Sequence, residues 1–139
     1  MERIFVDTDV VLDLLSARDP HYQHAAELFS LSDKGKISLY ISALTFANLN
    51  YILSKQITQT KARKLLLKFK TLVQVLPVDD KIIDLSLVSD FTDFEDAIQN
   101  YTAMENDIKI LLTRNTRDYK KADITIMTAQ EYLQSSQHT

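Results

Sequence analysis

The sequence predicts an α/β fold in which helices cover both faces of a mostly parallel sheet. Short β-branched and aromatic runs alternate with stretches whose apolar residues recur at helical spacing, and this alternation is typical of parallel α/β proteins. The chain has 139 residues, one glycine and two prolines. That length suits one domain, and so few chain-breaking residues favour helices with short connections. We therefore expect a single three-layer α/β/α domain over residues 1–139.

Five short apolar runs have the composition of buried strands. The first, Ile4–Val6, is β-branched and aromatic without a polar residue, which predicts a strand buried on both faces. Pro77 interrupts the third run near its end and limits how far that strand can pair. The expected strands cover residues 4–6, 37–41, 73–78, 109–113 and 124–127.

Seven helices are expected around these strands. Pro20 stops the first and can open the second, and Gly35 suits the turn after the second. Ser42 is a candidate cap for the third, and Thr128 with Glu131 forms a capping box at the start of the last. The expected helices cover residues 10–17, 21–33, 43–55, 60–70, 81–88, 93–104 and a final stretch after 128.

Composition excludes several classes of function. The chain has no cysteine, which rules out disulfides, zinc–thiolate sites and thiol nucleophiles. Its apolar runs are far too short to cross a membrane, and no basic start with an apolar signal core is present, so we expect a cytoplasmic protein. The net charge of −3 argues against broad electrostatic adhesion to nucleic acid but allows a local basic patch.

Asp7, Thr8 and Asp9 directly follow the first strand. Open α/β sheets place ligands at the carboxyl ends of their strands, and a dense group of oxygens there suits a hard cation such as Mg²⁺. The alternative is structural, because Thr8 or Asp9 can cap the next helix and favour its positive end.

Asp93 and Asp96 offer a second pair of carboxylates. A spacing of three residues puts both on one face of a helix, in its first turn, where Asp93 is also a good cap. Asp96 is followed by the apolar and small face of Ala97, Ile98 and Tyr101. Its carboxylate is therefore expected to point toward the sheet.

Two further polar stretches are candidates. Residues 113–118 follow a strand and offer a hydroxyl, an amide, a carboxylate and two guanidinium groups; the alternative is a solvated turn with local ion pairs. Residues 61–70 form the most basic part of an acidic chain. They are either the solvent-exposed face of a helix that packs on the core or a surface that contacts phosphates.

The opening resembles the first motif of haloacid-dehalogenase-type phosphatases, with Asp7 as nucleophile and Asp9 as acid and base. Residues 111–113 imitate the second motif of those enzymes. They need a lysine and then an acidic pair after that threonine. Here the acidic pair precedes Thr113 and too little chain follows it, so the order of motifs argues against this family.

The whole chain resembles a PIN domain, the nuclease fold of the VapC toxins of bacterial toxin–antitoxin pairs. The matching stretches are Phe5–Asp13, Asp93–Ala97 and Leu112–Tyr119, in the order and spacing of the family. The resemblance implies a PIN-like α/β/α fold and cleavage of RNA that depends on Mg²⁺ or Mn²⁺. It also implies a homodimer and a cognate antitoxin as partner.

The resemblance implies roles for individual residues. The catalytic and metal-binding carboxylates fall on Asp7, Asp96 and Asp118. The supporting groups fall on Thr8, Asp9, Asp93, Thr113 and Asn115, with Asp9 at a position where the family more often has Asn. The RNA backbone is expected to be guided by Arg114, Arg117, Lys61, Lys64 and Lys68.

One position departs from the family pattern. The family usually has a Ser-x-x-Thr-x-x-Glu arrangement after the second strand, and here Ser42 and Thr45 are followed by Asn48. The Asn48 carbonyl can still bind the metal, but less strongly than a carboxylate. This substitution motivates the alternative that the chain is a PIN-like partner-binding module with weak or no catalysis.

Overall fold

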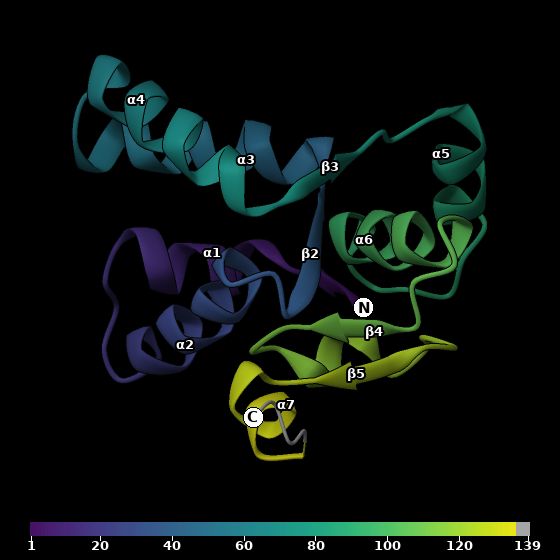
Figure 1. The fold of residues 1–139 in the computed structure, drawn as a ribbon. Coiled ribbons are helices and arrows are strands. Elements are labelled where there is room, and N and C mark those ends of the chain that lie inside the picture. The colour runs from purple at the N-terminus through teal and green to yellow at the C-terminus, as the bar shows by residue number, and fades with distance from the viewer. Residues whose placement is uncertain (136–139) are drawn as a thin grey trace.

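The computed structural model describes residues 1–135 and contains one sheet of five parallel strands (Figure 1). The strand order is β3-β2-β1-β4-β5. The strands are β1 (Glu2–Val6), β2 (Ile37–Ser42), β3 (Gln74–Leu76), β4 (Ile110–Leu112) and β5 (Thr125–Met127). The predicted α/β class is confirmed, and the sheet is parallel throughout.

Helices cover both faces of this sheet. Along β1 the side chains alternate: Ile4 and Val6 pack against α1 to α4 and α7, whereas Phe5 packs on the opposite face with residues of α6 and η2. Figure 1 shows α1 and α2 on one side and α5 and α6 on the other. The helices are α1 (Thr8–Leu15), α2 (Tyr22–Asp33), α3 (Ala43–Gln56), α4 (Gln59–Phe69), α5 (Asp80–Leu87), α6 (Phe94–Glu105) and α7 (Ala129–Ser135), with 3₁₀ turns η1 (Lys70–Leu72) and η2 (Thr116–Tyr119). Within residues 1–135, none of them combines the length and apolar character needed to cross a membrane.

Several element boundaries differ from the sequence-based prediction. The first helix begins at Thr8 rather than at residue 10, because its N-cap is Asp7 and not Thr8 or Asp9. The Asp7 carboxylate accepts a hydrogen bond from the Thr8 amide and so satisfies one free donor at the helix start. The expected loop at 114–118 turns into η2, and the third strand pairs only as far as Leu76, before Pro77.

The predicted caps and turn are confirmed. Ser42 accepts from the Thr45 amide at the start of α3, and Asp93 accepts from the Asp96 amide at the start of α6. Gly35 has a φ of 72°, the left-handed conformation that glycine adopts without a side-chain penalty. The capping box at α7 also forms, since Thr128 and Glu131 exchange backbone-to-side-chain hydrogen bonds.

The position of β1 places the candidate site. β1 lies between β2 and β4, so the chain first builds β2 and β3 on one side and then crosses to build β4 and β5 on the other. Ligand sites of open α/β sheets form where the strand order reverses in this way, at the carboxyl ends of the strands. Asp7 follows β1, Ser42 ends β2 and Thr113 follows β4, so three polar side chains lie along this edge.

The core predicts a clear contrast between two leucine truncations. Leu111 is fully buried between the sheet and α6, whereas Leu67 on α4 is 71% exposed. Leu111→Ala should lower the free energy of unfolding by about 2–5 kcal/mol, because it removes buried apolar area and leaves a cavity. Leu67→Ala, the matched control, should change it by less than about 0.5 kcal/mol. Urea denaturation measures both, and equal effects would contradict the assignment of this core.

Candidate active site

A hollow of about 510 Å³ opens at the carboxyl edge of the sheet. It collects side chains from α1, α3, α6 and the loop after β4, which are far apart in the sequence. Seven of the residues predicted for the site line it: Asp7, Thr8, Asp9, Asn48, Asp96, Arg114 and Asn115. The fold therefore brings half of the fourteen residues that the sequence singled out to this one hollow.

Asp7 is buried at this hollow and surrounded by hydrogen-bond donors. Its Oδ1 accepts from the Thr8 amide at 2.8 Å and from Gln99 Nε2 at 3.4 Å. Its Oδ2 accepts from the hydroxyls of Thr113 and Tyr119, each at 3.0 Å. A carboxylate offers about four lone-pair sites, so these four donors fill the acceptor capacity of Asp7.

Gln99 is a site residue that the sequence-based analysis missed. It is buried on α6, where its Nε2 donates to the Thr45 hydroxyl at 2.8 Å and its Oε1 accepts from the Ser42 hydroxyl at 2.6 Å. Together with its contact to Asp7, this network ties α3 and α6 to the end of β1. A glutamine on the inner face of a helix was the available signal, because a buried amide persists only where it is hydrogen-bonded.

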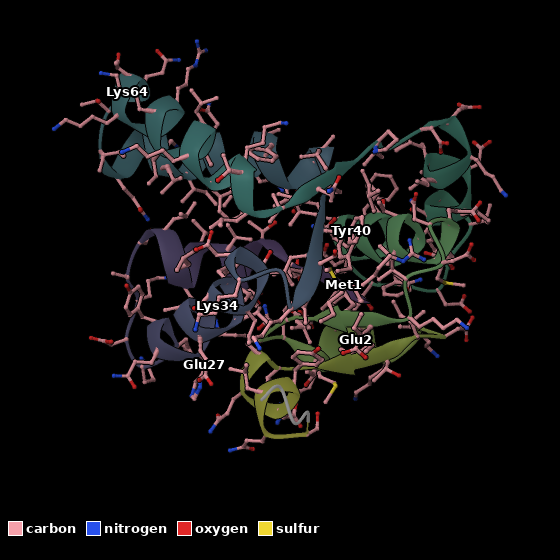
Figure 2. All side chains as sticks on the ribbon, viewed as in Figure 1. Met1, Glu2, Glu27, Lys34, Tyr40 and Lys64 are labelled. Carbon is pink, nitrogen blue, oxygen red and sulfur yellow. The ribbon has the colours of Figure 1, made fainter. Side chains whose placement is uncertain are left out.

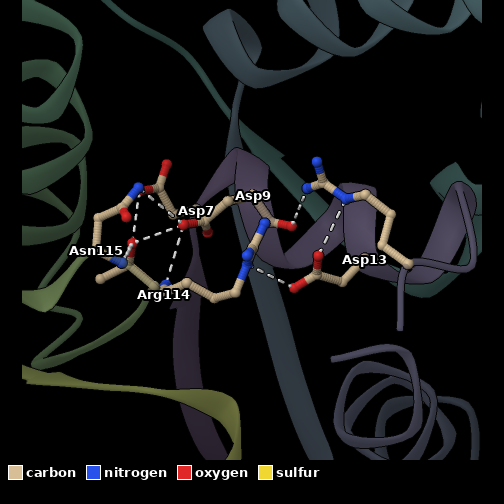
Figure 3. Close-up of polar contacts among 7 residues, drawn as sticks. Asp7, Asp9, Asp13, Arg114 and Asn115 are labelled. Carbon is tan, nitrogen blue, oxygen red and sulfur yellow. Dashed lines mark hydrogen bonds and ion pairs between the residues drawn. The ribbon is translucent and has the colours of Figure 1, made fainter. Parts of the chain in front are cut away.

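Asp9 holds the loop that follows β4 (Figure 3). Its Oδ2 accepts from the Arg114 amide at 3.0 Å and from Asn115 Nδ2 at 3.4 Å, and it lies 3.2 Å from the Thr113 hydroxyl, whose one hydrogen is shared with Asp7. Its Oδ1 is buried and has no hydrogen-bond partner within residues 1–135. A buried carboxylate oxygen without a partner is costly, so a cation or a water beside this atom would be stabilising.

Arg114 is anchored by a second buried acid, Asp13 of α1 (Figure 3). Arg114 Nε lies 3.0 Å from Asp13 Oδ2, at an angle that makes an ion pair without a hydrogen bond, and Arg18 Nε donates to Asp13 Oδ1 at 3.2 Å. Asp13 is only 2% exposed, so the two guanidinium groups offset the cost of burying its charge. The predicted Arg114 therefore lies at the site, but part of its charge is committed to an acid to which the sequence-based analysis gave no role.

Asp96 points back toward the sheet, as its place on α6 predicts. Its Oδ1 lies 3.3 Å from the Tyr119 hydroxyl, the same hydroxyl that donates to Asp7 at 3.0 Å. Burial, followed by the charge of Asp7, raises the pKa of Tyr119, so the phenol keeps its proton and acts as a donor. A single hydroxyl thus lies between two carboxylates that are far apart in the sequence.

Two of the predicted acids lie outside the hollow. Asp93 is exposed and serves as the cap of α6. Asp118 is exposed on η2; its side chain forms no hydrogen bond or ion pair with any described residue and acts on Asp96 only through its charge. Within residues 1–135, no three acidic or histidine side chains are placed to hold one metal ion together. The structure therefore joins Asp7 with Asp96 and does not bring Asp118 into contact with them.

Among the uncharged and basic candidates, some line the hollow and others lie on separate surfaces. Asn48 lines the hollow from α3, on the same wall as Tyr51. Arg117 is exposed on η2, and no residue of α4 lines the hollow. Figure 2 shows Lys64 on α4, away from the strands. The lysines of this helix, Lys61, Lys64 and Lys68, are all exposed on that separate surface.

Burial and mutual repulsion change the acidity of the site. Burial raises the pKa of Asp7 to about 6, and the charge of Asp9 adds to this effect. Burial also raises the pKa of Asp96 to about 7, with further contributions from the charges of Asp7, Asp93 and Asp118. Burial raises the pKa of Asp9 as well. Carboxylates that resist ionisation in this way are stabilised by any positive charge placed between them.

A family model described as a PIN domain matches residues 3–117. This chain belongs to the PIN domain family.

Relatives of this PIN domain extend over nearly its whole length. It is 22% identical over 138 residues to Ribonuclease VapC1 of Aquifex aeolicus (strain VF5), covering 96% of this chain and 94% of that protein. A toxin–antitoxin complex from Klebsiella pneumoniae has a TM-score of 0.68 at 22% identity, covering 91% of this chain and 97% of the other. VapC20 of Mycobacterium tuberculosis, described as a Sarcin-Ricin loop cleaving toxin, has a TM-score of 0.66 at 16% identity, with coverage of 88% and 98%. These likenesses show a shared fold.

The donor set of this PIN domain fits a hard divalent cation. Asp7 and Asp96 supply two carboxylates on either side of one hydroxyl, Asp9 supplies a buried oxygen without a partner, and Asn48 supplies an amide on the same hollow. Mg²⁺ is commonly held by one or two carboxylates and completed by water. The residues present therefore suit Mg²⁺ or Mn²⁺ by their oxygen chemistry.

The raised pKa values predict how the metal-free PIN domain responds to pH. Aspartates titrate near 3.8 when unfolded, whereas Asp7 and Asp96 titrate near 6 and 7 when folded. Between about pH 4 and about pH 7 the folded state therefore binds more protons, and these two groups make stability fall as pH rises. Asp96→Asn should remove the upper part of this fall, so that the variant gains stability over wild type toward about pH 8.

The measurement is chemical denaturation across that pH range in the presence of a chelator. Asp84→Asn removes an exposed carboxylate of α5 and is the matched control, so it should follow the wild-type slope. If Asp96→Asn shows the wild-type dependence of the free energy of unfolding on pH, then Asp96 is not the source of that dependence.

Proposed function

We propose that this protein is a metal-dependent endoribonuclease and the toxin of a toxin–antitoxin pair. The observation that carries the proposal is the meeting of Asp7 and Asp96 around one hydroxyl, at the edge of the sheet where the strand order reverses. The relatives named above support it, because one is a ribonuclease and another is described as a Sarcin-Ricin loop cleaving toxin. We assign Mg²⁺ or Mn²⁺ as the cofactor, since both suit oxygen ligands.

Each residue of the hollow has a place in this proposal. Asp7 and Asp96 hold the cation directly, while Asn48 and Asp9 face it as weaker or second ligands. Asp118 acts on it only through its charge or through water. When bound, the cation offsets charge on the phosphoryl oxygens and helps a water to ionise. Thr113 and Asn115 position the acids and the loop, since the Thr113 hydroxyl lies within hydrogen-bond distance of both Asp7 and Asp9 and accepts from the Asn115 amide.

The proposal also assigns RNA, an antitoxin and a second copy of the chain as partners. Arg114 stands beside the acids and contacts the phosphate next to the bond that is cut, and Arg117 with the lysines of α4 guides more distant phosphates. We assign a cognate antitoxin as protein partner, by likeness to the toxin–antitoxin complexes. We also assign a homodimer, for which the exposed apolar side chains Leu87 and Val88 at the end of α5 offer a contact surface. We assign the cytoplasm as its location, where such an RNA substrate and an antitoxin partner would both be present.

Asn48 favours a second function, that of a partner-binding module with little catalysis. The amide lines the hollow where the family pattern has an acid, so the site has one negative charge fewer for holding a cation. The two functions separate in one assay, because only the nuclease cleaves RNA in a metal-dependent way.

The acids provide the direct test of cleavage. Asp7→Asn and Asp96→Asn should each lower Mg²⁺- or Mn²⁺-dependent cleavage by roughly a hundredfold or more, because each removes a charged ligand. Both variants should stay folded and be at least as stable as wild type without metal, since each relieves repulsion. A gel assay on RNA with added metal or chelator reads the loss, and Asp84→Asn is the control that should cleave normally. Cleavage that survives in both acid variants would assign the activity to another site or to a contaminant.

Asn48 provides a gain-of-function test. Asn48→Glu adds one negative charge to the hollow, so Mg²⁺ should bind roughly tenfold more tightly. Without metal the extra carboxylate should lower the melting temperature, and added Mg²⁺ should restore it by mass action. Asn48→Gln is the matched control, because glutamine has the same length as glutamate and carries no charge. Titration calorimetry and melting curves decide, and equal behaviour of both variants would place Asn48 outside the metal site.

A further inference from the structure

Tyr119 occupies an unusual position relative to the two acids that the proposed function assigns to the metal. It is 2% exposed, and its hydroxyl lies 3.0 Å from Asp7 Oδ2 and 3.3 Å from Asp96 Oδ1. Its ring is held edge-on by Phe91, with centroids 5.9 Å apart and planes at 78°. A buried, clamped ring therefore delivers one hydroxyl to the place between the two carboxylates.

The hydrogen bonds of Asp7 leave no room for a cation unless a donor withdraws. Oδ1 accepts from Thr8 and Gln99, and Oδ2 accepts from Thr113 and Tyr119, which fills the lone pairs of both oxygens. Of these donors, only the Tyr119 hydroxyl also contacts Asp96 among the described residues. A cation that binds both acids must therefore compete with this hydroxyl before any other donor.

The cation and the Tyr119 hydroxyl do not compete equally for the two acids, because the hydroxyl carries a single hydrogen. It can donate fully to one carboxylate at a time, and the shorter distance assigns that hydrogen to Asp7. A divalent cation, by contrast, interacts favourably with both carboxylates at once. The hydroxyl can thus hold the acids in the absence of metal and still be displaced when metal arrives.

We propose that Tyr119 is a positioning residue whose hydroxyl serves as a placeholder for the metal ion between Asp7 and Asp96. It stabilises the metal-free protein and weakens metal binding by the free energy of the hydrogen bond that the cation must break. The inference rests on the proposed metal site, but not on cleavage of RNA. It goes beyond the assignment of ligands because it gives an uncharged residue control over how tightly they bind.

Tyr119→Phe tests the placeholder, since it deletes the hydroxyl and keeps the ring against Phe91. Without metal, the variant should melt at a lower temperature than wild type, because two acids lose their shared donor. Titrated with Mg²⁺ or Mn²⁺ alone, it should bind the ion roughly tenfold more tightly, as expected when a hydrogen bond to a charged group no longer competes. A residue with a merely structural role would lower stability without tightening metal binding.

Tyr101→Phe is the matched control. Tyr101 packs against the same Phe91 ring, with centroids 6.2 Å apart, and its hydroxyl contacts neither acid within residues 1–135. It should leave metal affinity unchanged. Tyr119→Phe in an Asp7→Asn background gives a second measurement, because the stability cost of losing the hydroxyl should shrink once its charged acceptor is gone.

Four results would overturn the inference: weaker metal binding by Tyr119→Phe, lowered stability of that variant with unchanged metal binding, no change in either property relative to Tyr101→Phe, or no binding of either ion to wild type. Cleavage of RNA is read in a separate assay. A protein that binds metal as expected but leaves RNA intact would refute the proposed nuclease and leave the placeholder standing.

Discussion

The constraint on which this site depends is the burial of the Asp7 carboxylate at the end of the central strand. A charge in that position is costly unless donors surround it, and here they come from α1, α6, the end of β4 and η2. Each of these segments is thereby fixed relative to β1. The arrangement of the hollow therefore follows from the need to provide the buried Asp7 carboxylate with hydrogen-bond donors.

The architecture was predictable because its signals are local. Ile4–Val6 is apolar on both faces, and a strand of that kind requires helices above and below it. Ser42, Asp93 and Gly35 act within a few residues of themselves, so their roles as caps and turn followed from spacing alone. Where local prediction failed, it failed at Asp7, which caps its own helix while belonging to the site.

The inner contacts of the site were not predictable, because they join distant parts of the chain. Nothing near Gln99 in the sequence indicates that its amide reaches Asp7 and α3, and nothing near Tyr119 indicates that its hydroxyl meets two acids. Asp13 likewise needed the fold to reveal its two arginine partners. Asp118 is the reverse case. The resemblance to the family grouped it with the metal-binding acids, yet its side chain is exposed.

The order of strands in the sheet has a consequence for protein synthesis. Asp7 emerges early from the ribosome, but its partners Thr113 and Tyr119 lie more than a hundred positions later, and β4 must pair beside β1 before they can reach it. A nascent chain therefore carries an incomplete centre until Thr113 and Tyr119 have been translated. Premature termination before η2 would therefore yield a fragment in which Asp7 lacks the Tyr119 hydroxyl as a donor.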